Sequence, residues 1–195
     1  SNTGVGYRVF YGNTTGSSNN AVGTQALYSN STGSDNTAMG HRALFLSTTA
    51  TGNAAFGYAS LYNNSTGSYN TGLGFNALND NTTASHNTAV GYASMATNTT
   101  GQYNIALGKN SLTSNTTASY NVALGYESMA HNTTGANNTA TGYHALKANT
   151  TGAENTALGK GSLANNTTAS NNTAVGRDSL FTNTTGDSNT SVGVA

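Results

Sequence analysis

The chain has 195 residues, of which 6% are charged, and six Lys and Arg residues balance six Asp and Glu residues to a formal net charge of zero. Because the cations are scattered singly along the sequence, no basic patch is predicted, which excludes nucleic acid and anionic membrane surfaces as partners. The lack of cysteine excludes disulfides, thiolate metal sites and thiol catalysis. No apolar run approaches the roughly 18 residues that cross a bilayer, so no membrane span is expected.

The dominant feature is a unit of seventeen residues that repeats without insertion or deletion. The clearest copy runs from Asn87 to Tyr103 and reads N-T-A-V-G-Y-A-S-M-A-T-N-T-T-G-Q-Y. Positions are counted from its first Asn, which recurs at Asn2, Asn19, Asn36, Asn53, Asn70, Asn87, Asn104, Asn121, Asn138, Asn155, Asn172 and Asn189. An unbroken repeat leaves no place for a boundary, so we predict a single repeat domain over residues 1–195. We expect it to be a window of a longer fibre, because neither end carries an atypical polar capping unit.

The first predicted elements of each unit are two short strands, near positions two to four and seven to ten. Position four is apolar in eleven of twelve copies, with Thr141 as the exception, and position nine is apolar in all eleven copies. Apolar residues that recur at the coil period align when coils stack, so both positions are predicted to face inward. Positions three and eight hold almost only Ala, Ser or Gly, which suits a backbone that another layer approaches closely.

Two corners are predicted between the strands. Position five is Gly in all twelve copies, from Gly6 to Gly193. This strictness indicates a positive φ or a contact that excludes even a methyl group. Positions twelve to fifteen read mostly N-T-T-G or N-T-T-A, and Asn and Thr side chains bond the local backbone in turns. Position fifteen is Ala in four copies, so a positive φ is not required there.

These elements predict an all-β fold, a parallel β-solenoid (β-roll) of about eleven seventeen-residue coils. Strands are favoured over helix because Gly and β-branched Thr recur every few residues. Coils stacked at the strand spacing of about 4.8 Å would form a rod of roughly 50 to 55 Å. Burying two sizeable apolar side chains per coil stabilises the fold by less than the conformational entropy cost of ordering the coil's backbone. We therefore expect further apolar surface to be buried between chains. We therefore predict a parallel homotrimer.

The runs N-T-A-V-G at Asn87–Gly91 and N-T-A-L-G at Asn155–Gly159 resemble two groups of surface proteins. One is the head domain of trimeric autotransporter adhesins, whose coils carry a similar S-V-A-I-G run. The other is the N-T-A-x-G, A-L, N-T-T-G repeat of phage tail-fibre and related surface proteins. The likeness covers the whole chain. It implies a left-handed, trimeric β-roll on a cell or virion, which attaches to a host surface or holds an adhesive tip away from it.

One departure from the first group concerns the period, since autotransporter heads use a shorter coil. The cross-section and handedness therefore stay open at this point, as does a single-chain or differently assembled filament.

Catalytic, metal and cofactor sites are not expected. Catalysis needs a few unlike groups that converge, whereas a repeat presents the same group at every coil. His41, His86, His131 and His144 occupy four different positions of the unit, and the carboxylates are equally dispersed. The turns lack the Asp that calcium-binding β-rolls carry, and the short Gly-rich runs do not complete a phosphate-binding motif.

Two sets of residues are candidate binding or modification sites. Ten residues of position twelve begin the N-glycosylation pattern N-[S/T]-T, although Asn and Thr there also suit turns and side-chain ladders. They are Asn13, Asn30, Asn64, Asn81, Asn98, Asn115, Asn132, Asn149, Asn166 and Asn183. Six tyrosines next to polar amides are candidates for contact with a glycan or receptor, or for packing between chains. They are Tyr11, Tyr28 and Tyr62 at position ten, and Tyr69, Tyr103 and Tyr120 at position seventeen.

The predicted function is that of a non-enzymatic structural and adhesive fibre segment from a phage tail fibre or bacterial surface adhesin. Its expected partners are further copies of itself and a cell-surface glycan or receptor, and its expected location is extracellular, on a virion or cell surface. A self-assembling extracellular scaffold, with or without a glycan coat, is the alternative. Ice binding is a minor alternative suggested by the rows of Thr.

Overall fold

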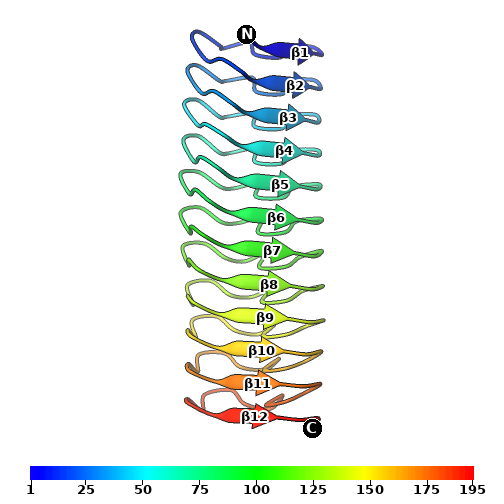
Figure 1. Cartoon of the computed structure of the whole chain (residues 1–195), viewed down its shortest axis with the longest axis vertical. Helices are drawn as coiled ribbons and strands as arrows, with labels where there is room; N and C mark the ends of the chain where they lie inside the picture. The colour runs from blue at the N-terminus through cyan, green and yellow to red at the C-terminus, as the bar shows by residue number, and fades with distance from the viewer.

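The computed structural model describes all 195 residues as a straight rod of stacked coils, with the chain ends at opposite ends of the rod (Figure 1). One strand from each coil joins a single parallel sheet in the order β1 to β12, and no helix is present. The strands are β1 (Thr3–Val5), β2 (Asn20–Val22), β3 (Thr37–Met39), β4 (Ala54–Phe56), β5 (Thr71–Leu73), β6 (Thr88–Val90), β7 (Ile105–Leu107), β8 (Val122–Leu124), β9 (Thr139–Thr141), β10 (Thr156–Leu158), β11 (Thr173–Val175) and β12 (Thr190–Val192). The predicted all-β parallel β-solenoid of about eleven coils is confirmed.

The sheet keeps one register from end to end. Each strand occupies positions two to four, and each residue pairs with the residue seventeen places away, as Ala89 pairs with Ala106. Successive side chains of a strand point to opposite faces. The residue at position three points into the rod and is fully buried in almost every coil, whereas positions two and four face outward.

The second predicted strand, over positions seven to ten, is wrong. Positions six to eleven form successive turns, in which positions seven and nine adopt positive φ, for example 60° at Gln25 and 49° at Leu27. The Gln25 N–H donates to Tyr7 O of the preceding coil (2.8 Å), and the Leu27 N–H donates to Ala43 O of the following coil (3.0 Å). A positive φ costs a non-Gly residue about 1–2 kcal/mol. The positive φ at positions seven and nine lets the N–H of position seven donate to the preceding coil and that of position nine donate to the following coil. These hydrogen bonds between coils compensate the local cost.

The inward orientation predicted for position four is also wrong. Val22, Met39 and Leu107 expose 41%, 44% and 48% of their surface. A strand has only one inward face, and here the small residue of position three takes it. Position nine faces inward as predicted, with every residue from Leu27 to Leu163 fully buried. The core is therefore a narrow column of Leu and Met flanked by Ala and Ser of positions three and eight.

Both predicted corners are confirmed. The Gly of position five has φ between 122° and 144° in every coil. A Cβ on Gly23 would lie 2.5 Å from Gly40 O of the next coil, so both reasons for Gly apply at once. Positions twelve to fifteen form the second bend, and position fifteen needs no positive φ.

Two columns of buried Asn run the length of the rod and fasten this bend. At position one, the Asn36 N–H donates to Asn19 Oδ1 (2.9 Å), and Asn36 Nδ2 donates to Ala50 O (2.8 Å). At position twelve, Asn98 Nδ2 donates to Asn81 Oδ1 (2.9 Å) and to Gly101 O (2.9 Å). Buried amides are stable only when their hydrogen bonds are made. Each Asn is therefore held by the identical residue of the neighbouring coil.

The ladder at position twelve breaks once, at Ser47. Its hydroxyl is too short to reach the neighbouring amides, so Ser47 Oγ and Asn30 Oδ1 are buried without a hydrogen-bond partner. Asn64 Nδ2, on the other side of the break, donates only to Gly67 O. An unsatisfied buried polar group costs about 1–3 kcal/mol.

Replacing Ser47 with Asn is therefore expected to stabilise the chain by about 1–3 kcal/mol, because the new side chain supplies a donor to Asn30 Oδ1 and an acceptor for Asn64. The midpoint of urea unfolding, followed by circular dichroism, measures the change. The matched variant Asn98→Ser makes a second gap and should lower the midpoint. An S47N midpoint at or below that of the wild type would contradict this description of the ladder.

Candidate functional site

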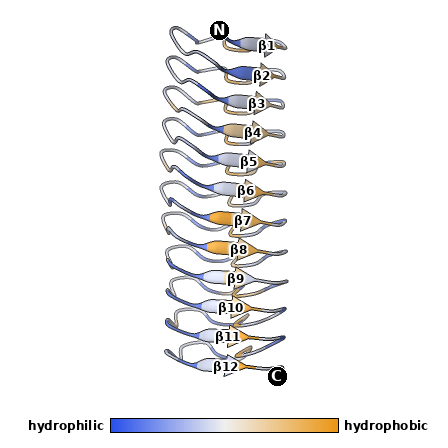
Figure 2. Ribbon diagram, viewed as in Figure 1, coloured by the Kyte–Doolittle hydropathy of each residue, from blue (hydrophilic) through white to orange (hydrophobic).

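The outward face of the sheet carries an apolar column, made by position four and interrupted only at Thr141. Seven of its members are exposed and the other five half-buried. Figure 2 shows the hydrophobic residues one above another at the carboxyl ends of the strands, with β7 and β8 hydrophobic throughout. There, Ile105 and Val122 add apolar side chains at position two. The exposed members of the column are Val5, Val22, Met39, Leu73, Leu107, Leu158 and Val192.

A second column, of aromatic residues at position six, lies two residues beyond the first along every coil. Its rings stack with centroids 4.9 to 5.5 Å apart, and Lys109 interrupts them with Nζ 5.7 Å from the Tyr92 centroid. The predicted contact residues did not include this column, although an aromatic residue recurring at position six is visible in the sequence. The stacked residues are His41, Tyr58, Phe75, Tyr92, Tyr126 and Tyr143.

The six predicted contact tyrosines lie in two separate columns. At position ten, Tyr11, Tyr28, Phe45 and Tyr62 stack with centroids 5.0 Å apart. At position seventeen, Tyr69, His86, Tyr103 and Tyr120 stack at 5.0 to 5.2 Å. Tyr28 and Tyr62 are half-buried, and the other four predicted tyrosines are exposed. Because in-register stacking covers the ring faces, these columns present ring edges and hydroxyls outward.

The ten predicted glycosylation residues lie inside the rod or at its end coils. Asn30, Asn64, Asn81, Asn98, Asn115, Asn132, Asn149 and Asn166 are fully buried, and Asn13 and Asn183 are half-buried. In the regular part of the ladder, Nδ2 donates both to the preceding Asn and to the carbonyl of position fifteen. A sugar on Nδ2 would replace one of these bonds and has no room in the core. The eight buried residues are therefore excluded as glycan carriers in the folded rod, which corrects the expectation.

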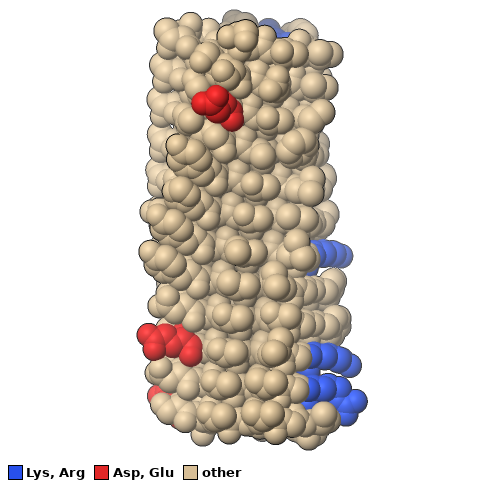
Figure 3. Space-filling view, viewed as in Figure 1, with Lys and Arg blue, Asp and Glu red and all other residues tan.

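The charges are dispersed along the sequence, but the cations keep to one side of the rod. The six cations occupy only positions six, seven and ten, whereas Asp35, Glu154 and Asp187 occupy positions sixteen and seventeen. The other three carboxylates, Asp80, Glu127 and Asp178, lie at positions seven and eleven, close to the cations. Figure 3 shows Lys and Arg projecting from one edge of the rod, and acidic groups at two separate heights toward the other edge. The zero net charge therefore conceals a cationic edge, which single-residue scattering in the sequence did not reveal.

The one cluster of interacting ionisable groups centres on Glu127. Its Oε2 lies 2.6 Å from Lys147 Nζ and 3.1 Å from His144 Nε2. Hydrogen bonds with Lys147 and Tyr126 lower the pKa of Glu127 to about 2. Burial and the nearby Lys147 charge lower the pKa of His144, and the hydrogen bond to Glu127 raises that of Tyr126.

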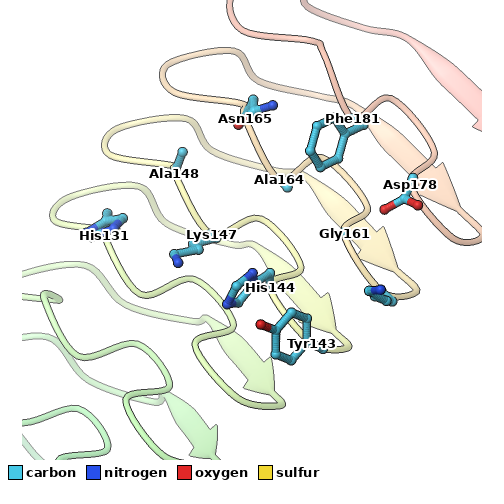
Figure 4. A pocket seen from close by; sticks show the side chains of 11 residues that line it. His131, Tyr143, His144, Lys147, Ala148, Gly161, Ala164, Asn165, Asp178 and Phe181 are labelled. Atoms are coloured by element: carbon cyan, nitrogen blue, oxygen red, sulfur yellow. The ribbon is translucent and has the colours of Figure 1, made fainter.

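The cavity next to this cluster has a volume of about 330 Å³ and draws on four successive coils. Figure 4 shows His131, His144 and Tyr143 along one side and Phe181 and Asp178 on the other, with Gly161 and Ala164 between them. A smaller neighbour of about 260 Å³ is lined by Glu127, His131 and Lys147 among others. Both hollows lie beside the stretch from Ala96 to Ala164 in which position ten holds Ala, Thr or Lys in place of the aromatic residues of the first four coils, and the cavity of about 330 Å³ also reaches Phe181, where position ten is aromatic again.

No three His, Asp or Glu side chains converge in an arrangement that could hold a metal ion. The chain also contains no helix with the length and apolar character needed to cross a bilayer. Comparison with known proteins found no matching family profile, no matching curated protein and no matching solved structure. The surface columns and the cavity are therefore the features on which a functional proposal must be built.

The Glu127 cluster predicts a specific pH dependence. Since the folded pKa lies below the unfolded value of about 4.5, the cluster stabilises the rod above that pH and loses its effect as pH falls towards about 2. Glu127→Gln should lower the thermal midpoint at neutral pH by an amount equivalent to at most about 1 kcal/mol, because the pair is partly solvated.

The difference between wild type and E127Q should close as pH falls from 4.5 to 2. Glu154→Gln is the matched control, because Glu154 makes no ion pair. A gap between wild type and E127Q that stays constant over this range would contradict the assigned role of Glu127.

Proposed function

We propose that the chain is a non-enzymatic structural and adhesive segment of an extracellular fibre, of the kind carried by phage tails or bacterial surfaces. The observation that supports this most strongly is the outward apolar column of position four. A soluble monomer rarely exposes a contiguous apolar strip along its whole length, and such a strip indicates a protein contact. The covering surface is a second copy of the chain, because another rod of the same repeat matches the column coil for coil.

The architecture suits mechanical work. The rod contains 127 backbone hydrogen bonds, of which only 22 belong to the strand ladder, so the turn segments also tie each coil to its neighbours. Because the repeat has no insertions, no loop interrupts this bonding. A rod bonded along its axis at every coil resists bending and carries its end surfaces at a fixed distance, as a fibre spacer requires.

Parallel association into a trimer is the assembly that we propose. In parallel copies the position-four columns run side by side at equal height, and the aromatic column of position six extends the same apolar strip. The resemblance to trimeric adhesin heads and tail-fibre repeats supports this number of chains. Apolar burial between the copies adds the free energy that the narrow core of Leu and Ala lacks.

The rival function is an extracellular scaffold with no receptor. The same apolar column supports it, whereas the burial of eight of the ten candidate Asn residues argues against a dense N-linked glycan coat. Adsorption of the labelled rod to panels of bacterial and host cells separates the two functions, because only the adhesive segment binds one cell type in preference to others. Uniform absence of binding would favour the scaffold.

Ice binding has one supporting observation on the sheet. Position two holds Thr in eight strands, and these side chains face outward beside the position-four column. However, Asn20, Ala54, Ile105 and Val122 break that Thr row. Thermal hysteresis of the purified rod would support this alternative, and its absence would remove it.

The interface is tested by the triple variant Leu73→Thr, Leu107→Thr and Leu158→Thr. The fold tolerates Thr at position four, since Thr141 occupies it in β9. The variant should keep the circular dichroism spectrum of the wild type. Its sedimentation mass should fall from three chains to one, because the apolar contacts that offset the free-energy cost of association are lost.

The matched control replaces Tyr69, Tyr103 and Tyr120 with Ser, which already occurs at position seventeen as Ser18 and Ser188. This control should remain trimeric. A folded wild type with the mass of a single chain would refute the assembly. Dissociation of the tyrosine variant alone would move the interface to position seventeen.

A further inference from the structure

The repeat is interrupted on one face, in the four coils that line the cavity of about 330 Å³. A strict repeat presents identical groups at every coil, so a selective binding site requires unlike residues that meet at one place. Gly161 is the only Gly at position seven, and Ala164 stands at position ten where the first coils carry aromatic rings. The two departures adjoin each other and open the hollow that Figure 4 shows.

The hollow has the size of a small-ligand site. Its volume of about 330 Å³ lies at the lower end of the range for ligand pockets, which is about 300–1,000 Å³. Gly161 and Ala164 form the floor, and Asp178 Oδ1 reaches its Gly161 end, so close that a Cβ on Gly161 would clash with it. The other polar groups stand around the rim, where they can orient a ligand that rests on the floor.

The rim carries charges of both signs. Lys147 and Lys160 both line the cavity; Lys147 is paired with Glu127, whereas Lys160 takes part in no ion pair. His131 and His144 add ring nitrogens. The only carboxylate on the rim is Asp178, whose Oδ2 lies 3.4 Å from Arg177 Nε and is partly neutralised by it. An anionic group on the ligand would therefore find an unpaired ammonium at Lys160.

One wall is an aromatic ring with a face that no other ring covers. Phe181 belongs to position ten, but the residue one coil earlier is Ala164, so no ring stacks on that face. Phe181 Cδ2 lies 3.6 Å from the point where a Cβ on Gly161 would be, which places the ring against the cavity floor. An uncovered aromatic face accepts the C–H face of a pyranose ring, which the stacked tyrosine columns cannot do.

From these observations we infer that the cavity around Gly161 binds a carboxylated sugar residue, such as a uronic acid, within an acidic glycan. The pyranose ring lies on Phe181 and the Gly161–Ala164 floor, and its carboxylate pairs with Lys160 while Lys147 and the two His residues stand beside it. The inference rests on the proposed adhesive function and gives that function a ligand class. A bare inorganic anion would leave the aromatic face unused.

Titration calorimetry on the full chain tests the inference with three probes: a glucuronate oligosaccharide, a neutral glucose oligosaccharide of equal length, and monomeric glucuronate. The acidic oligosaccharide should bind at least about tenfold more tightly than the neutral one, a difference of about 1.4 kcal/mol. Tighter binding of the oligosaccharide than of the monomer identifies a glycan as the source. Equal binding of the two identifies a free sugar acid and overturns the glycan assignment.

Two variants with matched controls keep the test independent of folding. Lys160→Thr should weaken binding about tenfold, whereas Lys109→Thr, at the same position but outside the cavity, should leave it unchanged. Thr24 shows that position six tolerates this residue. Gly161→Ala should abolish binding, because the added Cβ would clash with Asp178 Oδ1 and push that carboxylate into the hollow. Ala59 and Ala93 hold position seven with φ of 51° and 50°, so the rod should still fold.

Equal affinity for the acidic and neutral oligosaccharides, or equal losses in K160T and K109T, would overturn the site. Failure of the site is distinguishable from failure of the proposed function. If the rod adsorbs to cells and K160T adsorbs equally well, the function stands and the site falls. If the rod binds the acidic probe but adsorbs to no cell, the site stands and the adhesive function falls.

Discussion

Backbone hydrogen bonding along the rod axis is the constraint on which the rest of the structure depends. Every coil must repeat the path of its neighbour so that each amide meets a carbonyl one coil away. Any insertion would break the register for all seventeen positions. This requirement explains Gly at position five, where the next carbonyl lies too close for a Cβ, and the positive φ of Leu and Met at position nine. It also explains the two Asn columns, because an amide stacked on an identical amide satisfies donor and acceptor together.

Columns on the surface are the direct consequence of this register. Because like residues align, a preference at one position becomes a stripe along the whole rod, as the apolar strip of position four shows. The same alignment stacks the tyrosines of positions ten and seventeen and so hides the ring faces that a sugar would need. Selectivity can then arise only where the repeat departs from itself, as it does at Gly161 and Ala164. The regular part of the rod supports assembly, and the irregular part supports recognition.

The sequence predicted the period, the strand over positions two to four, the Gly corner, the Asn bend and the buried position nine, because each leaves a strict residue pattern. It misplaced position four, because hydrophobicity alone does not say which face of a strand is inside. In Thr88–Val90 the small Ala89 fits the narrow interior and Val90 is left outside. The turns of positions six to eleven were missed because residues such as Leu27 and Gln25 carry no local signal for positive φ. The cavity was beyond sequence reasoning, since its lining residues lie at different positions of four units.

The most direct test of stacking in register uses the absence of natural cysteine. Thr88→Cys paired with Ile105→Cys places two thiols on strand partners, whereas Thr88→Cys with Val122→Cys separates them by two coils. In a disordered chain, the segment between the members of the second pair is twice as long as that of the first, and it would close only about threefold more slowly because closure entropy depends weakly on loop length. The stacked rod predicts rapid intrachain oxidation of the first pair and essentially none of the second. Rates within about threefold of each other would contradict the structure described here.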